Sequence, residues 1–224
     1  MPANDLTLPE SLLLLALKDD TGEKRGNYID YALAGAALTE LVLADRLVEA
    51  GKKLEFASNA PTGDAYLDGV LAAVVKKGAG RNAKDYVQHI GGKHDLLEPL
   101  YAGLVARGIL DEQTAKVLWV FDSTKWPQTN PTPERELKAR LRMAITGSGV
   151  VDTRDSALIA LAHNTDVLRH NFDRDDLKRH KERIKTISEG GLLPPNAAIE
   201  TIKSMQTVMM IATIMPAIIV STTS

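Results

Sequence analysis

The distribution of apolar residues is most unusual at residues 31–47, YALAGAALTELVLADRL. A surface helix carries apolar residues on one stripe, but residues 32–44 are apolar on nearly every side. Thr39 and Glu40 are the only polar interruptions in this run. The pattern predicts a buried central helix, and its small alanine and glycine residues would let other helices approach its backbone closely.

Amphipathic helices are predicted before and after the buried helix. Thr7 and Glu10 have the spacing of a capping box, and the leucine-rich helix that they begin extends to about Lys18. Apolar residues at helical spacing predict another helix after Asp64, whose side chain, like that of Thr62, suits an N-cap. Comparable patterns predict helices over residues 83–90, 96–105, 134–145, 153–168 and 173–187.

The last apolar segment, residues 208–220, has the sequence VMMIATIMPAIIV. A membrane-spanning helix needs roughly 20 apolar residues, and Pro216 interrupts this shorter run. We therefore expect a buried core helix here and no transmembrane segment. Near the other end, residues 12–17 are apolar but lack the preceding positive charge of a signal peptide.

Short β-strands are predicted in two places. Residues 47–49 and 54–57 flank a turn at residues 50–52, which is typical of a hairpin. Residues 111–116 have the pattern of one further helical turn, and residues 117–122, VLWVFD, have that of a strand.

Composition favours a mostly helical protein. Alanine and leucine are abundant, and aromatic residues make up only 4% of the chain, which favours helices over sheets. A chain of 224 residues can bury a full core, so we expect one domain over residues 1–224. The predicted fold class is all-α, with buried core helices surrounded by amphipathic helices and one or two short β-hairpins.

Cysteine content and charge narrow the classes of function. The chain contains no cysteine, so disulfides and thiolate metal sites are excluded, which fits a cytoplasmic protein. The 27 basic and 29 acidic side chains give a net charge of −2, which argues against nucleic acid as a partner. An anionic partner must therefore be bound by a local cluster of basic residues.

No enzyme signature is evident in the sequence. The nearest approach to a zinc site is His163 with Asp166 and His170, but an HExxH motif is missing. Residues 147–149, GSG, lack the nucleophile elbow of hydrolases, and residues 76–82, KKGAGRN, lack the spacing of a nucleotide-binding loop. We expect a protein without catalytic residues, metal or cofactor.

Three groups of basic residues are candidates for binding an anion. The first group lies in a polar loop beside an aromatic residue. The second lies directly before a predicted helix, whose free amides attract phosphate. Their candidate binding residues are Lys24, Arg25, Tyr28, Lys93 and His94. The third group, between residues 178 and 185, would be attracted to an anionic membrane surface. Solvated surface charge is the alternative interpretation of each group.

Six segments together resemble the Golgi phosphoprotein 3 family. In chain order they are LLLLALKDDTG, LAGAALTELVLADRL, NAPTGDAYLD, LVARGIL, FDSTKWPQTN and RDSALIALAHNTDVL, and they extend over nearly all of the chain. The resemblance implies an all-α globule with buried core helices, surrounding amphipathic helices and a small β-hairpin. This agrees with the fold class that the hydrophobic pattern predicts.

The resemblance also implies a function at a membrane surface. Eukaryotic members of the family bind phosphatidylinositol 4-phosphate through a basic pocket, and they contact coat proteins and the cytosolic tails of glycosyltransferases. The pocket of those members contains a tryptophan and three arginines, and none of the four is matched in this sequence. The corresponding positions lie at or near Arg25, Ala34, His94 and Leu97. If the loop and the helix start lie side by side, the residues that replace them are Lys24, Arg25, Lys93 and His94.

These features predict a compact, prokaryotic-type member of the family that has no enzymatic activity. We expect it at the cytoplasmic face of a membrane, bound to a phosphoinositide such as phosphatidylinositol 4-phosphate or to another anionic head group. An adaptor that binds protein tails without recognising lipid is one alternative. A winged-helix-like DNA-binding protein is another, suggested by two helix-then-strand units at residues 38–56 and 100–121.

Overall fold

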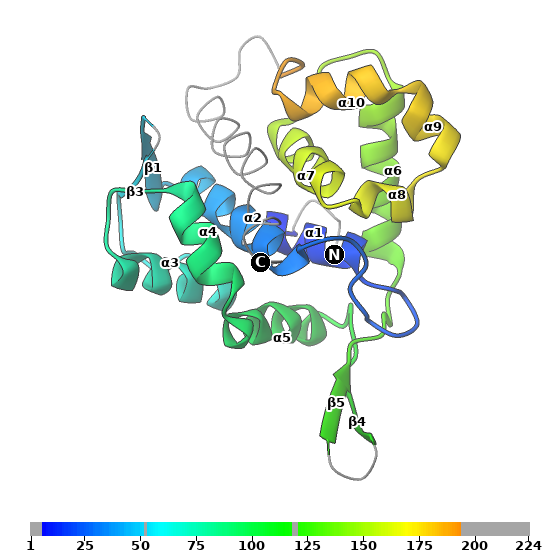
Figure 1. The fold of residues 1–224 in the computed structure, drawn as a ribbon. Coiled ribbons are helices and arrows are strands. Elements are labelled where there is room, and N and C mark those ends of the chain that lie inside the picture. The colour runs from blue at the N-terminus through cyan, green and yellow to red at the C-terminus, as the bar shows by residue number, and fades with distance from the viewer. Residues whose placement is uncertain (1–5, 52, 118–120, 194–224) are drawn as a thin grey trace, which may run out of the picture.

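In a computed structural model of the chain, the predicted buried helix is α2, Ile29–Leu43, at the centre of the helical body (Figure 1). Residues 32–42 are all buried. The helices that pack against α2 include α1, Leu8–Ala16; α3, Ala65–Lys77; α4, Ala83–Gly91; and α7, Thr153–Asn164. The prediction of a central helix surrounded by others is therefore confirmed.

The structure describes residues 6–51, 53–117 and 121–193. The helix expected at residues 208–220 lies outside this range. Within it, most secondary structure is helical and the strands form two small sheets, as the predicted fold class requires. No described helix combines the length and the apolar character that crossing a bilayer needs. The other helices are the 3₁₀-helix η2, His94–Leu97; α5, Glu98–Ala106; α6, Thr132–Thr146; α8, Val167–Asn171; α9, Arg174–Arg179; and α10, Lys181–Ser188.

The two polar residues in the buried run of α2, residues 32–42, both have hydrogen-bond partners. The Thr39 hydroxyl donates to the Gly35 carbonyl at 3.0 Å, which satisfies it within the helix. The Glu40 carboxylate accepts a hydrogen bond from the Leu8 backbone N–H at 2.8 Å and from Arg154 Nη2 at 2.8 Å. Glu40 therefore joins α2 to the start of α1 and to α7.

The start of α1 is the predicted capping box. The Thr7 hydroxyl accepts a hydrogen bond from the Glu10 backbone N–H, and the Thr7 N–H donates to Glu10 Oε2 at 2.8 Å. Arg107 Nη1 lies 2.8 and 2.9 Å from the two oxygens of Glu10. Because Glu10 itself is buried, this pair ties α1 to the end of α5.

The first predicted hairpin is confirmed. β1, Leu47–Ala50, and β2, Lys53–Phe56, pair in antiparallel fashion. A short third strand, β3, Arg81–Asn82, pairs with β2 and leads directly into α4. This sheet therefore fixes the connection between α3 and α4.

The helical turn predicted at residues 111–116 is wrong. The chain forms β4, Gln113–Val117, which pairs in antiparallel fashion with β5, Phe121–Lys125. A helical turn this short has little stability alone, whereas a strand gains ladder hydrogen bonds from the following segment. Figure 1 shows the resulting hairpin extending away from the helices.

The helix predicted over residues 153–168 is interrupted after Asn164. Asp166 has a left-handed backbone with φ of 61°, and α8 begins just after it. The Thr165 carbonyl accepts a hydrogen bond from the Asn27 backbone N–H at 2.8 Å. The Asn27 N–H, in the loop before α2, therefore takes the place of the donor that the next turn of helix would supply. The segment predicted as one helix over residues 173–187 is likewise two helices, α9 and α10.

Candidate anion-binding surface

Lys24 and Arg25 are held against the end of α1. Leu17 and Lys24 form an antiparallel bridge, and the Arg25 backbone N–H donates to the Ala16 carbonyl at 2.6 Å. The polar loop before α2 therefore has a defined path, and the position of both basic side chains follows from it.

Asp30 brings Lys24 and His94 together. This residue lies in the first turn of α2, where the helix dipole favours a negative charge. Its Oδ1 forms an ion pair with Lys24 Nζ, and its Oδ2 lies 3.5 Å from His94 Nδ1. The His94 side chain is 82% exposed, whereas that of Asp30 is 17% exposed. The loop before α2 and the start of η2 thus lie side by side, as the prediction required.

The other predicted residues are arranged differently. Arg25 Nη2 donates to the Leu17 carbonyl at 2.7 Å, so this guanidinium faces the end of α1. Tyr28 is half-buried with φ of 55°, and its ring packs 6.4 Å from that of Tyr31. Lys93 directly precedes η2, and its ammonium forms no ion pair within the described part of the chain. The assembled cluster is therefore Lys24, Asp30 and His94, with Lys93 next to it.

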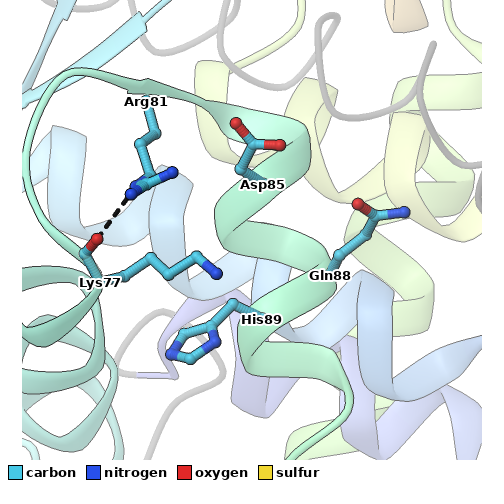
Figure 2. A pocket seen from close by; sticks show the side chains of 5 residues that line it. All are labelled: Lys77, Arg81, Asp85, Gln88 and His89. Atoms are coloured by element: carbon cyan, nitrogen blue, oxygen red, sulfur yellow. Dashed lines mark hydrogen bonds between the residues drawn. The ribbon is translucent and has the colours of Figure 1, made fainter.

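A second group of cations lines a pocket of about 280 Å³ between the end of α3 and α4 (Figure 2). Figure 2 shows the ammonium of Lys77 and the ring of His89 turned towards the same space. Arg81 Nε donates to the Lys77 carbonyl at 2.9 Å, which fixes the position of its guanidinium. Asp85 and Gln88, both on α4, complete the lining.

The environment of His89 favours its neutral form. Burial lowers the pKa of the His89 imidazole, and the positive charges of Lys93, Lys77, Lys76 and Arg81 lower that pKa further. The ring nitrogen Nε2 is buried and has no hydrogen-bond partner among the residues that the structure describes. The pocket therefore concentrates positive charge around an unsatisfied polar atom.

Sequence reasoning did not single out Arg81 or His89. It considered residues 76–82 only as a nucleotide-binding loop. Helical spacing does not relate His89 to Lys93, because Lys93 lies beyond the end of α4 with an extended backbone. The approach of Lys77 to His89 depends on how α3 packs against α4, and no local pattern contains this information.

The third basic group borders a cavity of about 550 Å³ among α7, α8, α9 and α10. His163 and Asp166, considered above as metal ligands, line this cavity. Over the described ranges, no group of three or more histidine, aspartate or glutamate side chains could hold a metal ion. The cavity instead has an apolar floor, formed by Leu168, Leu177 and Ile184.

Comparison with known families decides the membership of the chain. A model of the family described as Golgi phosphoprotein 3 (GPP34) matches residues 8–205. The chain belongs to the Golgi phosphoprotein 3 family. The resemblance carried by the six sequence segments is thus confirmed, and every helix of the described structure begins and ends within the range that the Golgi phosphoprotein 3 model matches.

Proposed function

We propose that this protein is a non-enzymatic, peripheral membrane protein that binds a phosphoinositide or a lipid with a similar anionic head group. Membership of the Golgi phosphoprotein 3 family supports the proposal. The observation that carries it is the convergence of Lys24 and His94, from distant parts of the chain, on Asp30.

The head-group phosphate would compete with Asp30 for Lys24 and His94. A phosphomonoester carries a charge of about −1.5 to −2 near neutral pH, so it attracts the Lys24 ammonium more strongly than a single carboxylate does, and its oxygens can accept a hydrogen bond from the His94 ring. The exposed position of His94 allows a head group to approach without rearrangement of the backbone. Lys93 adds a further charge beside the cluster.

No arginine is placed to bind the phosphate in a bidentate manner among the described residues of the proposed site, and this limits the expected affinity for the head group. Lysine binds phosphate as a point charge, whereas arginine binds it in a bidentate manner. Arg25 is directed to the Leu17 carbonyl. We therefore expect moderate affinity that falls as salt increases, because exposed charges are screened.

Vesicle flotation tests this function. Phosphatidylcholine vesicles are prepared with and without phosphatidylinositol 4-phosphate, and the protein recovered in the floating fraction is measured. We expect recovery only with the phosphoinositide. The double variant Lys24→Gln and Lys93→Gln should reduce recovery several-fold, since each charge near an anionic surface contributes about 1 kcal/mol.

The matched control removes two charges from the third basic group, Lys178→Gln with Lys185→Gln. These residues lie on α9 and α10, and they form no ion pair with any described residue. Equal, negligible recovery with and without phosphoinositide would exclude the proposed function. A loss of recovery in the control variant alone would move the membrane contact to α9 and α10.

A second candidate function, binding of a protein tail, is favoured by the cavity among α7, α8, α9 and α10. Its apolar floor has a rim of basic residues: Arg169, Arg174, Lys178 and Lys181. An apolar floor with a basic rim fits an amphipathic peptide that carries acidic residues. Under this hypothesis a partner is captured from lysate by the wild-type protein and by Lys24→Glu, but is lost with Lys178→Glu.

A further inference from the structure

The pocket between α3 and α4 contains a buried nitrogen that lacks a partner, Nε2 of His89. Native proteins leave few buried polar atoms without a hydrogen bond, and a ligand or a water molecule can supply the missing partner. The residues that line the pocket with His89 indicate which class of ligand the pocket suits.

Two cations line the pocket with His89: Lys77 from the end of α3 and Arg81 from β3. Lys76 and Lys93 are not lining residues, but their positive charges also lower the pKa of His89. No described residue accepts a hydrogen bond from the two terminal nitrogens of Arg81 or from the ammonium of Lys77. Asp85, on α4 itself, is the single carboxylate in the lining. The pocket thus presents unused donors and an excess of positive charge.

We propose that this pocket is a second anion site, separate from the cluster of Lys24, Asp30 and His94, and that it binds a phosphomonoester dianion through Lys77, Arg81 and His89. The proposal does not depend on the proposed membrane function. Three donor groups from three elements match the three terminal oxygens of a phosphomonoester. The volume of about 280 Å³ is at the lower end for small-molecule pockets, which suits a ligand of this size.

The cations in the lining outnumber its single carboxylate, Asp85, so the pocket has a net positive potential. Because Coulomb energy is proportional to the charge of the ligand, a dianion gains about twice as much from this potential as a monovalent anion does. Binding of the dianion also favours the charged imidazole, so it raises the pKa of His89. An NMR signal from the His89 ring therefore reports directly on the site.

The test is a titration of the full-length protein with inorganic phosphate and with glycerol 3-phosphate, followed by NMR of the histidine rings. The His89 signal is assigned by its loss in His89→Gln. We expect saturable shifts of this signal. Arg81→Gln should weaken binding about tenfold or more, because it removes hydrogen bonds to a charged group.

Lys84→Gln is the matched control. Lys84 lies on α4, as His89 does, but does not line the pocket, so its loss should weaken binding less than about twofold, through long-range charge alone. Circular dichroism establishes that both variants fold. Equal weakening by Arg81→Gln and Lys84→Gln would overturn the proposal, because it would show general attraction rather than a site.

The source of the phosphate is distinguished by a vesicle arm that uses phosphatidic acid, a lipid phosphomonoester. Shifts of His89 with soluble phosphates support the site with a free ligand. Shifts that appear only with phosphatidic acid vesicles and disappear in Arg81→Gln support it with a lipid ligand. No His89 response in either arm overturns it, whereas flotation of the wild-type protein with and without phosphatidylinositol 4-phosphate decides the proposed function independently.

Discussion

Single buried polar residues determine how the helices of this protein are joined. Glu40 is conspicuous in the sequence, because it interrupts an otherwise apolar segment. Its partners could not be predicted, since the Leu8 N–H lies 32 positions away and Arg154 lies 114 positions away. The sequence thus reveals that a buried carboxylate needs partners, but the three-dimensional arrangement decides which residues provide them.

Replacing Glu40 with leucine tests this role. The change leaves the Leu8 N–H without its acceptor and Arg154 without its carboxylate, so we expect the free energy of unfolding to fall by about 2–4 kcal/mol. Urea unfolding measures it. As a control, Glu182→Leu on the exposed surface of α10 should change stability by less than about 0.5 kcal/mol. Similar losses in both variants would contradict the role assigned to Glu40.

At the scale of helices and strands, the sequence was sufficient to predict an element where its hydrogen-bond partner lies only a few residues away. The capping box of Thr7 and Glu10 is complete within four residues, and the hairpin of β1 and β2 closes over a short turn. The end of α7 could not be predicted, because a distant donor, the Asn27 N–H, takes the Thr165 carbonyl. Similarly, β4 needed β5 as its partner before it could be recognised as a strand.

The close approach of α4 to α2 makes a prediction at this scale. A Cβ atom added at Gly91 would lie 2.6 Å from Tyr31 Cδ1 and 2.8 Å from Tyr31 Cα. Gly91→Ala should therefore force the two helices apart and lower the free energy of unfolding by about 1–3 kcal/mol. Thermal and urea unfolding measure the effect.

Gly69 provides the matched control, because it lies inside α3 and a Cβ there would meet only Leu96 Cδ2, at 3.7 Å. Gly69→Ala should raise the free energy of unfolding by about 0.5–1 kcal/mol, since alanine favours a helix interior. If Gly91→Ala were also stabilising, α4 could not lie as close to Tyr31 of α2 as these distances require.

For the whole molecule, the distribution of charge matters more than its sum. The net charge of −2 gave no indication of an anion site, yet Lys76, Lys77, Arg81 and Lys93 gather around one histidine. The cluster at Asp30 was predicted in part, because family resemblance placed its two segments side by side. The pocket at His89 was not predicted, because it exists only once α3, β3 and α4 are packed together.

The lowered pKa of His89 makes the free energy of unfolding depend on pH. The pKa of His89 lies below its ordinary value of about 6.5 in the folded protein. As pH falls through that value, the unfolded chain therefore binds more protons than the folded protein does. The stabilisation from neutral His89 is complete above about pH 6.5, and it is lost progressively towards the lower folded pKa. We expect the free energy of unfolding to decrease between about pH 7.5 and about pH 5.5, and to decrease less in His89→Gln.

A bound dianion should oppose this loss. Phosphate itself takes up a proton over this pH range, so sulfate, which stays doubly charged, is the suitable probe. Bound sulfate raises the pKa of His89 and stabilises the folded state by mass action, so at saturating sulfate the difference in slope between wild type and His89→Gln should shrink or reverse. Urea unfolding at both pH values, with sulfate or with chloride at equal ionic strength, measures the effect. A wild-type slope that is unchanged by His89→Gln and equal in both salts would mean that His89 neither keeps its lowered pKa nor contacts the anion. The pH dependence would then have to come from groups outside this pocket.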